Sequence, residues 1–296
     1  YIELKKQFKN YGYDLSTYDL NSFEDSEIII YIDLPKNIKF FKGKKQILFL
    51  GENEMIYNNQ YNTDINKNFL KVFTWNDNLV DNKKYFKYNF SYYLDLKNFP
   101  YPNNKRKLVA MINSNKFIRH PNEIYSERRK IINWFEKNNL TDFDLYGEGW
   151  NKYLFKFYPF TFFNRFHNFR MFLNKKFNKN FLVYKGQVMD KRQTLKKYKF
   201  AFCFENSNSY DGYITEKIFD AFFSGTIPIY FGAPDIQDYI PENCYIDYRK
   251  FINLKELYKK LRNINSNEII NYQDNIKSFL KSSKYDQFEL KLSTNK

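Results

Sequence analysis

Short apolar runs alternate along the chain with segments that have helical spacing. Runs with the length of buried strands stand at residues 28–34, 46–50, 107–112 and 200–204. Between them, apolar residues recur at intervals of three and four, as at residues 123–137 and 253–264, which predicts amphipathic helices. Strands that alternate with helices form parallel sheets, so the pattern predicts an α/β fold.

The clearest unit of this kind lies within residues 199–251. An aromatic strand at residues 200–204 is followed by a polar loop and then by a helix that Thr215 can cap. Gly225 ends the helix, and residues 226–231 read as the next strand. A strand, a helix and a strand within about thirty residues form a βαβ unit, which requires a parallel sheet.

Lys217 stands in the first turn of that helix, where the helix macrodipole disfavours a cation. An anion at the helix start would remove the conflict, because backbone N–H groups and the ammonium would share it. A phosphate-bearing ligand is the simplest such anion. A lysine that points into water is the alternative, and this residue alone leaves both open.

Composition restricts the class of protein more than its identity. Aromatic residues make up 21% of the 296, too many for a disordered chain, and the formal charge of +15 suits a nucleotide sugar, an anionic membrane or nucleic acid. Cys203 and Cys244 both fall in predicted strands and are expected to be buried and free of disulfides. No cluster of Cys and His predicts a metal site.

The best linker is residues 98–106, which contain two prolines among polar neighbours. We therefore expect an N-terminal domain at 1–103, a C-terminal domain at 104–270, and a helix and tail at 271–296. No run approaches the roughly 18 apolar residues of a membrane span, and no signal peptide is visible, which predicts a cytoplasmic protein. The chain starts at Tyr1 without a methionine, so we expect that its N-terminus has been trimmed.

Three blocks of the central stretch carry a family resemblance: FENS at 204–207, YITEK at 213–217 and GTIPIYFGA at 225–233. Their order and spacing resemble the donor-binding signature of the glycosyltransferase family 10 α-1,3/4-fucosyltransferases, and a weaker resemblance covers residues 45–251. The resemblance implies the GT-B architecture, two Rossmann-like α/β domains facing a cleft. It also implies transfer of L-fucose from GDP-fucose to a hydroxyl of an N-acetylglucosamine-containing glycan, with inversion and α-1,3 linkage.

Glu52 is the expected catalytic residue. It directly follows the strand at 46–50, and open parallel sheets bind ligands at the carboxyl ends of their strands. The Gly51-Glu52-Asn53 triplet resembles the family's N-terminal motif, whose glutamate is the proposed general base for the acceptor hydroxyl. A glutamate in a surface turn is the alternative.

The resemblance also assigns donor-binding residues, with Lys217 and Arg128 neutralising the departing GDP. Arg128 is preferred to its neighbour Arg129, and two solvated helix arginines are the alternative. The remaining expected donor contacts are Asn115, Lys185, Asn206, Tyr213 and Glu216, of which Glu216 would accept from the ribose hydroxyls.

No essential metal is expected, because lysine and arginine can neutralise a diphosphate, although added Mn²⁺ would be compatible with stimulation. Asp142 and Asp144 form the Asp-x-Asp triplet that metal-dependent transferases of another fold use. Here the triplet opens a short predicted strand, so we interpret it as structural.

Residues 151–181 depart from the family pattern, with phenylalanines interleaved among lysines and arginines. This insertion fits an interfacial membrane anchor, a surface for single-stranded nucleic acid, a flap or simple packing. We favour a partly buried helical excursion that makes peripheral membrane contact.

Two other functions are compatible with the sequence. One is a GT-B transferase that uses a different GDP-sugar, since the nucleotide contacts would be the same. The other is a nucleic-acid-binding protein, which charge and aromatic content suggest but no recognised motif supports. The expected partners are therefore GDP-fucose and a glycan acceptor, without nucleic acid.

Overall fold

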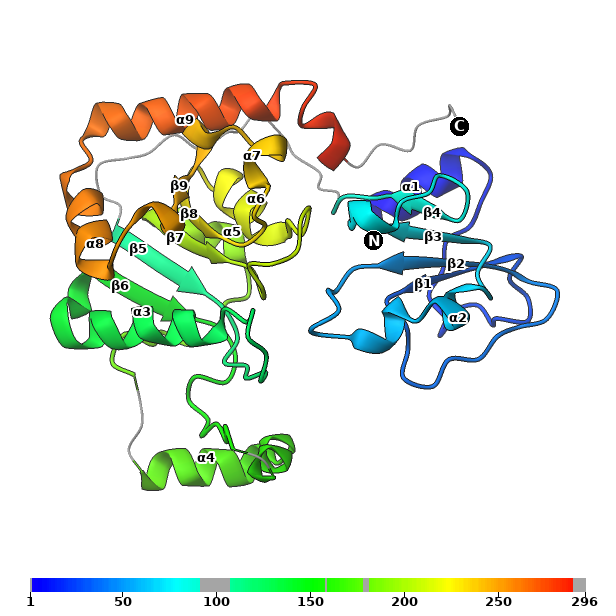
Figure 1. The fold of residues 1–296 in the computed structure, drawn as a ribbon, viewed down its shortest axis with the longest axis horizontal. Coiled ribbons are helices and arrows are strands. Elements are labelled where there is room, and N and C mark those ends of the chain that lie inside the picture. The colour runs from blue at the N-terminus through cyan, green and yellow to red at the C-terminus, as the bar shows by residue number, and fades with distance from the viewer. Residues whose placement is uncertain (1, 91–106, 158, 178–180, 290–296) are drawn as a thin grey trace. The chain divides into compact units, whose positions relative to one another are not determined.

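The computed structural model describes residues 2–90, 107–157, 159–177 and 181–289 (Figure 1). These residues divide into two compact units, each with its own parallel sheet. The first unit runs to residue 90 and includes residues 211–213 and 286–289; the other described residues form the second. The predicted α/β class is confirmed. The predicted linker at 98–106 and boundary at 103 lie outside the described residues, so the domain limits stay a prediction.

The sheet of the first unit has four strands in the order β1-β2-β3-β4, all parallel. Its elements are α1 (Ile2–Asn10), β1 (Ile28–Ile32), β2 (Lys45–Leu50), α2 (Thr63–Asn66), β3 (Lys71–Thr74) and β4 (Tyr85–Lys87). Leu48, Leu50 and Val72 from the central strands form its core with Phe69. The strand predicted at 28–34 ends earlier, because Asp33 has a positive φ of 58° and leaves the extended conformation.

The sheet of the second unit has five strands in the order β6-β5-β7-β8-β9, again all parallel. Its strands are β5 (Lys107–Ile112), β6 (Phe143–Tyr146), β7 (Tyr198–Phe204), β8 (Ile227–Phe231) and β9 (Ile246–Asp247). The run Phe200 to Phe204 is buried throughout, as a central parallel strand covered on both faces requires. The predicted βαβ unit is therefore present.

Helices cover both faces of this sheet (Figure 1). They are α3 (Tyr125–Asn138), α5 (Lys191–Leu195), α6 (Glu216–Phe222), α7 (Ile236–Tyr239), α8 (Leu254–Asn263) and α9 (Ser266–Leu280), while a further helix, α4 (His167–Lys176), lies in the insertion. Ile132 of α3 and Leu261 of α8 share one core cluster with the strands. Phe222 of α6 packs against Phe279 of α9, with ring centroids 6.1 Å apart.

Two local predictions need correction. Thr215 precedes α6, but its hydroxyl does not cap the helix, because it donates to Glu205 instead. Cys244 lies in a 3-10 turn rather than a strand, since Pro241 starts a tight turn in which the Cys244 N–H donates to the Pro241 carbonyl. Both cysteines are buried and free, as predicted.

The insertion is more exposed than predicted. It contains a 3-10 helix, η5 (Phe160–Arg165), and α4, which stand apart from the sheet of the second unit (Figure 1). Phe155, Phe163 and Phe169 pack on one another with centroids 5.6 to 6.1 Å apart, so they form a small cluster of their own. Phe160, Phe162 and Phe166 contact its edge at Phe163, with centroids 5.9 to 6.5 Å apart, and remain exposed. Across the described residues, no helix is long and apolar enough to cross a membrane.

Candidate functional site

The turn that carries Glu52 is fixed by its backbone. Asp33, in its positive-φ conformation, accepts from the N–H groups of Gly51 (2.7 Å) and Glu52 (3.0 Å). The Glu52 carbonyl accepts from Gln60 Nε2 at 2.5 Å and from the Tyr61 hydroxyl at 2.8 Å. The strand end, the neighbouring strand and the following helical turn therefore hold this half-buried glutamate in one place.

The carboxylate of Glu52 has a partner from the YITEK block. The Tyr213 hydroxyl donates to Glu52 Oε2 at 3.1 Å, and residues 211–213 group with the first unit. Tyr213 is 2% exposed and packs on Trp75, whose indole N–H donates to the Gly51 carbonyl. The sequence assigned Tyr213 to the donor; its bond to Glu52 was not predicted, because no local pattern joins residues so far apart.

In the second unit the chemistry centres on Glu205, which the sequence analysis missed. Glu205 follows β7 and is fully buried. Its carboxylate accepts from the Thr215 N–H (2.9 Å), the Thr215 hydroxyl (2.7 Å) and the Lys217 ammonium (3.0 Å). The anion expected at the start of α6 is thus a side chain of the protein. The conflict around Lys217 is resolved without a ligand, so it no longer argues for a phosphate.

The charges around Lys217 support one another. Burial lowers the pKa of Lys217, but Glu205 and Glu216 outweigh it and the net shift is upward, which keeps the ammonium charged. Burial raises the pKa of Glu216, but Lys217 and Lys191 outweigh it and lower that pKa to about 2. Lys191 lies 3.3 Å from Glu216 and links α5 to α6. Glu216 is therefore a carboxylate at any physiological pH.

Gly232, in the GTIPIYFGA block, is required by the same network. A Cβ at this position would lie 2.5 Å from Glu205 Cγ and 2.5 Å from the Tyr230 hydroxyl. Only a glycine directly after β8 leaves room for the buried side chain of Glu205. The three sequence blocks of the resemblance therefore meet at one place: Glu205 from FENS, Thr215 and Lys217 from YITEK, and Gly232.

Arg128 and Asn206 also belong to this group. Arg128 is 3% exposed, and its Nη2 donates to the carbonyls of Phe204 (2.8 Å) and Glu205 (2.5 Å) and to Asn206 Oδ1 (3.2 Å). These bonds tie α3 to the carboxyl end of β7. Arg128 thus has an evident structural role, and its contact with a diphosphate stays a prediction.

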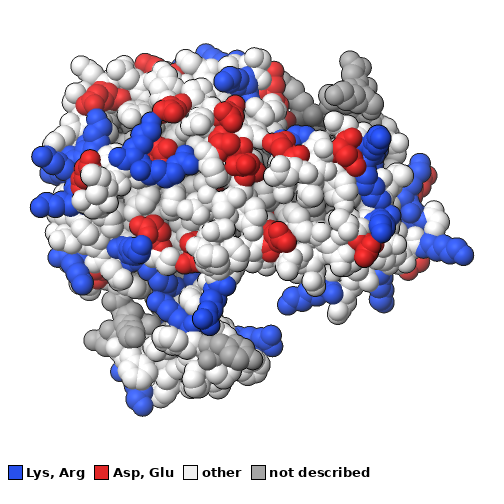
Figure 2. All heavy atoms as spheres, viewed as in Figure 1, with Lys and Arg blue, Asp and Glu red and all other residues white. Residues whose placement is uncertain are grey.

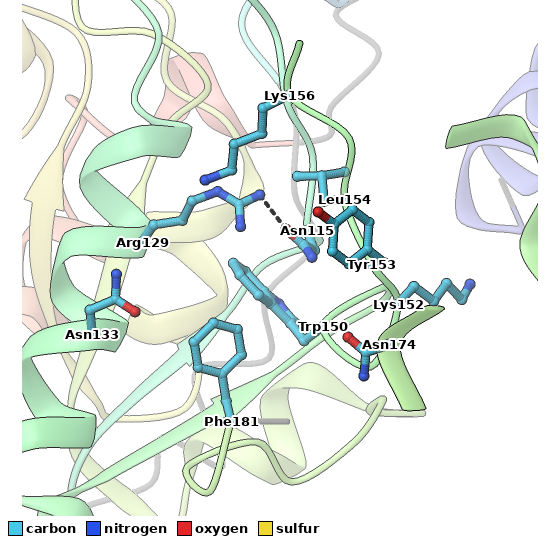
Figure 3. A pocket seen from close by; sticks show the side chains of 10 residues that line it. All are labelled: Asn115, Arg129, Asn133, Trp150, Lys152, Tyr153, Leu154, Lys156, Asn174 and Phe181. Atoms are coloured by element: carbon cyan, nitrogen blue, oxygen red, sulfur yellow. Dashed lines mark hydrogen bonds between the residues drawn. The ribbon is translucent and has the colours of Figure 1, made fainter. Parts of the chain in front are cut away.

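Arg129, the residue after Arg128, lines a pocket of about 170 Å³ beside the insertion (Figure 3). Arg129 donates to Asn115 Oδ1, and Asn115 Nδ2 donates to the Gly149 carbonyl at 2.9 Å. The guanidinium lies 5.5 Å from the Trp150 ring, and burial lowers the pKa of Arg129 to about 10. Asn115 therefore lies with the arginine that the sequence analysis did not choose.

Lys185, another expected donor residue, pairs with a carboxylate outside the group around Lys217. Its Nζ lies 3.7 Å from Asp144, a buried carboxylate that also accepts from Lys107 and Tyr198, the first residues of β5 and β7. This geometry gives no support to a phosphate contact by Lys185. It does assign Asp144 a structural role. Within the described part of the chain, no group of three or more His, Cys, Asp and Glu could hold a metal ion.

Comparisons with known proteins bear on the family and the fold. A family model described as "Glycosyltransferase family 10 (fucosyltransferase) C-term" matches residues 102–274. An α-(1,3)-fucosyltransferase of Helicobacter pylori is 47% identical over 70 residues, which are 23% of this chain and 14% of that protein. An α-(1,4)-fucosyltransferase of Arabidopsis thaliana is 47% identical over 60 residues, 20% of this chain and 15% of that protein. The matched segments thus span about a seventh of these relatives.

A crystal structure of an α1,3-fucosyltransferase is similar over 95% of this chain and 77% of its own, with a TM-score of 0.52 and 19% identity. A second crystal structure, of an α1,3-fucosyltransferase with GDP, is similar over 86% of this chain and 70% of its own, with a TM-score of 0.51 and 20% identity. At this identity the likeness establishes the fold. The fold is GT-B, as the sequence predicted.

Proposed function

The chain belongs to glycosyltransferase family 10, the fucosyltransferases, and we propose that it transfers L-fucose from GDP-fucose to a hydroxyl of an N-acetylglucosamine-containing glycan. The names of the relatives from Helicobacter pylori and Arabidopsis thaliana support fucose as the transferred sugar. We propose α-1,3 linkage, because the bacterial relative and the two similar crystal structures carry that specificity in their names.

The observation that carries the proposal is the convergence of the three sequence blocks on Glu205. Its carboxylate holds the Lys217 ammonium at 3.0 Å, at the carboxyl edge of a parallel sheet, where folds of this class bind ligands. A cation that is already in place can stabilise the charge that grows on GDP as it leaves, and such stabilisation is often the largest catalytic contribution. Glu216, a carboxylate beside Lys217, is available for the ribose hydroxyls.

We propose that Glu52 is the general base. The acceptor oxygen forms a bond to the anomeric carbon while the bond from that carbon to the GDP oxygen breaks, and the acceptor proton passes to Glu52. A single displacement from the face opposite GDP inverts the anomeric centre. Tyr213 donates to Glu52 Oε2, and this bond orients the carboxylate for proton transfer.

We further propose that no metal is essential, since Lys217 supplies positive charge for the departing GDP. Mn²⁺ would then act at most as a stimulant. Turnover in the presence of EDTA tests this point, and loss of turnover that only added metal restores would contradict it. A GT-B enzyme that uses another GDP-sugar is the second candidate, because Lys217 and Glu216 would contact the nucleotide rather than the sugar.

The test is a GDP-release assay with GDP-fucose and GDP-mannose against a panel of glycan acceptors. We expect turnover with GDP-fucose, and an NMR coupling constant in the product that reports inversion. Glu52→Gln should lower kcat by about 10²–10⁴-fold and leave GDP affinity unchanged. Lys217→Ala should lower both kcat and the affinity for GDP. Exposed Glu54→Gln and Lys255→Ala are the matched controls. Preference for GDP-mannose, or full activity of Glu52→Gln, would overturn the assignment.

A further inference from the structure

The insertion presents an unusual amount of aromatic surface. We define the Phe lobe as residues 151–157 and 159–177, which include η5 and α4. Eight of its phenylalanines are more than a third exposed: Phe157, Phe160, Phe162, Phe163, Phe166, Phe169, Phe172 and Phe177. Phe157 reaches 79% and Phe172 60%. Single exposed rings are ordinary, but a contiguous group of this kind marks a surface that meets a partner.

The charge of the Phe lobe has one sign. The sequence has no acidic residue between Glu148 and Asp190, whereas Asp and Glu number 33 over the whole chain. On the face shown in Figure 2, the lobe displays Lys and Arg but no Asp or Glu. Arg165, Lys175 and Lys176 are exposed, and the Arg165 guanidinium lies 5.3 Å from the Phe162 ring centroid. Cations and exposed rings therefore occupy the same surface.

The internal bonds of the lobe show which of its groups remain for a partner. Arg170 donates to the carbonyls of Tyr153 (2.6 Å) and Asn164 (3.2 Å), and Asn164 exchanges two bonds with the backbone of Phe155. These bonds hold the ends of the lobe together around its small aromatic cluster. The lobe is therefore held together by internal hydrogen bonds, and it exposes phenylalanines and lysines on its surface.

We propose that the Phe lobe docks the protein on an anionic phospholipid surface. Phenylalanine rings enter the boundary between headgroups and acyl chains, and adjacent cations pair with lipid phosphates. Single-stranded nucleic acid uses aromatic rings as platforms along a basic groove, whereas these rings protrude and contact one another. The combination of protruding Phe and unmixed positive charge favours the lipid surface. This docking is independent of the transferase assignment.

The test is co-sedimentation of the full chain with vesicles of phosphatidylcholine alone or mixed with phosphatidylglycerol, at low and high salt. We expect binding to the mixed vesicles that weakens as salt rises. Phe157→Ser together with Phe172→Ser should weaken binding at least about tenfold. Arg165→Gln, Lys175→Gln and Lys176→Gln together should weaken it by about tenfold or more, for the anionic vesicles only.

Two control variants make changes of the same kind elsewhere on the second unit. Ile252→Ser removes a side chain that is 92% exposed, and Lys255→Gln with Lys259→Gln removes exposed charge. Both should bind like the unchanged protein. Equal losses in the controls, no binding to anionic vesicles, or binding to a single-stranded oligonucleotide in place of vesicles would overturn the proposal. A change from oligomer to monomer in the double Phe variant, without vesicle binding, would instead assign the lobe to a second copy of the chain.

Discussion

The ion pair between Glu205 and Lys217 makes a quantitative prediction possible. Glu205 Oε2 and Lys217 Nζ are 3.0 Å apart, and their side chains are 0% and 17% exposed. Glu205→Gln keeps the size of the side chain and an oxygen that can still accept from Thr215, but removes the charge. Lys217→Met keeps the aliphatic length and removes the ammonium. The two single variants and the double variant form a thermodynamic cycle.

The expected size follows from distance and burial. Two unit charges at this distance attract by about 5–6 kcal/mol at an effective dielectric constant near 20. Burying the two ions costs several kcal/mol each, and this desolvation cost offsets most of their attraction. Removing both charges together therefore changes the stability little. Removing one partner leaves an uncompensated buried charge, which costs about 3–5 kcal/mol. We expect a loss of about 3 kcal/mol for each single variant and about 1 kcal/mol for the double variant, so the coupling energy is about 5 kcal/mol.

The measurement is urea unfolding followed by tryptophan fluorescence. Trp134 and Trp150 both belong to the second unit and report on the unit that contains the pair. The surface pair Lys250 and Glu242 is the control, since its atoms are 2.7 Å apart but its side chains are 60% and 57% exposed. Its coupling should stay below about 1 kcal/mol. If the Glu205–Lys217 coupling is no larger than that of the surface pair, the buried network does not hold α6 as argued.

Two further predictions concern the same network. Gly232→Ala should destabilise the second unit by about 1–3 kcal/mol and weaken GDP binding in a calorimetric titration, because the new Cβ would lie 2.5 Å from Glu205 Cγ; an unchanged unfolding midpoint would contradict this. The pKa of Glu216 is lowered to about 2, so its stabilising contribution is complete above the unfolded value near 4.5 and is lost as the pH falls toward 2. In Glu216→Gln, the free energy of unfolding should therefore fall less steeply than in the unchanged protein as the pH is lowered from about 4.5 to 2. If the two proteins lose stability equally over this range, the pKa of Glu216 is not lowered.

The elements that sequence predicts well are those whose pattern is local. The strand at 200–204 and the helix after Thr215 could be read directly, because a buried parallel strand is apolar throughout and a helix repeats its apolar residues at fixed intervals. Glu52 could be placed at a strand end for the same reason. Its partner Tyr213 could not, since 161 residues separate the two and only the fold joins them.

The helices predicted in the insertion are present, but the exposure of its phenylalanines was underestimated for a related reason. Its phenylalanines predict burial by their type, and the sequence gives no means of counting the partners available to bury them. In the structure, Phe155, Phe163 and Phe169 use one another, and rings such as Phe157 and Phe172 remain outside. Residue type predicts a preference for burial, while burial itself depends on the amount of neighbouring apolar surface.

Lys217 shows how a physical argument can predict that a partner is needed without identifying it. A cation in the first turn of α6 does need an anion, and the sequence offered no way to decide between a ligand and a carboxylate twelve residues earlier. The fold supplies Glu205, so Lys217 brings little unbalanced charge to attract a nucleotide. The pair instead fixes the position of the Lys217 ammonium, because Glu205 and Thr215 hold it before any donor binds. A preorganised charge requires no rearrangement when negative charge develops on the leaving group, and this is the form in which Lys217 would contribute to catalysis.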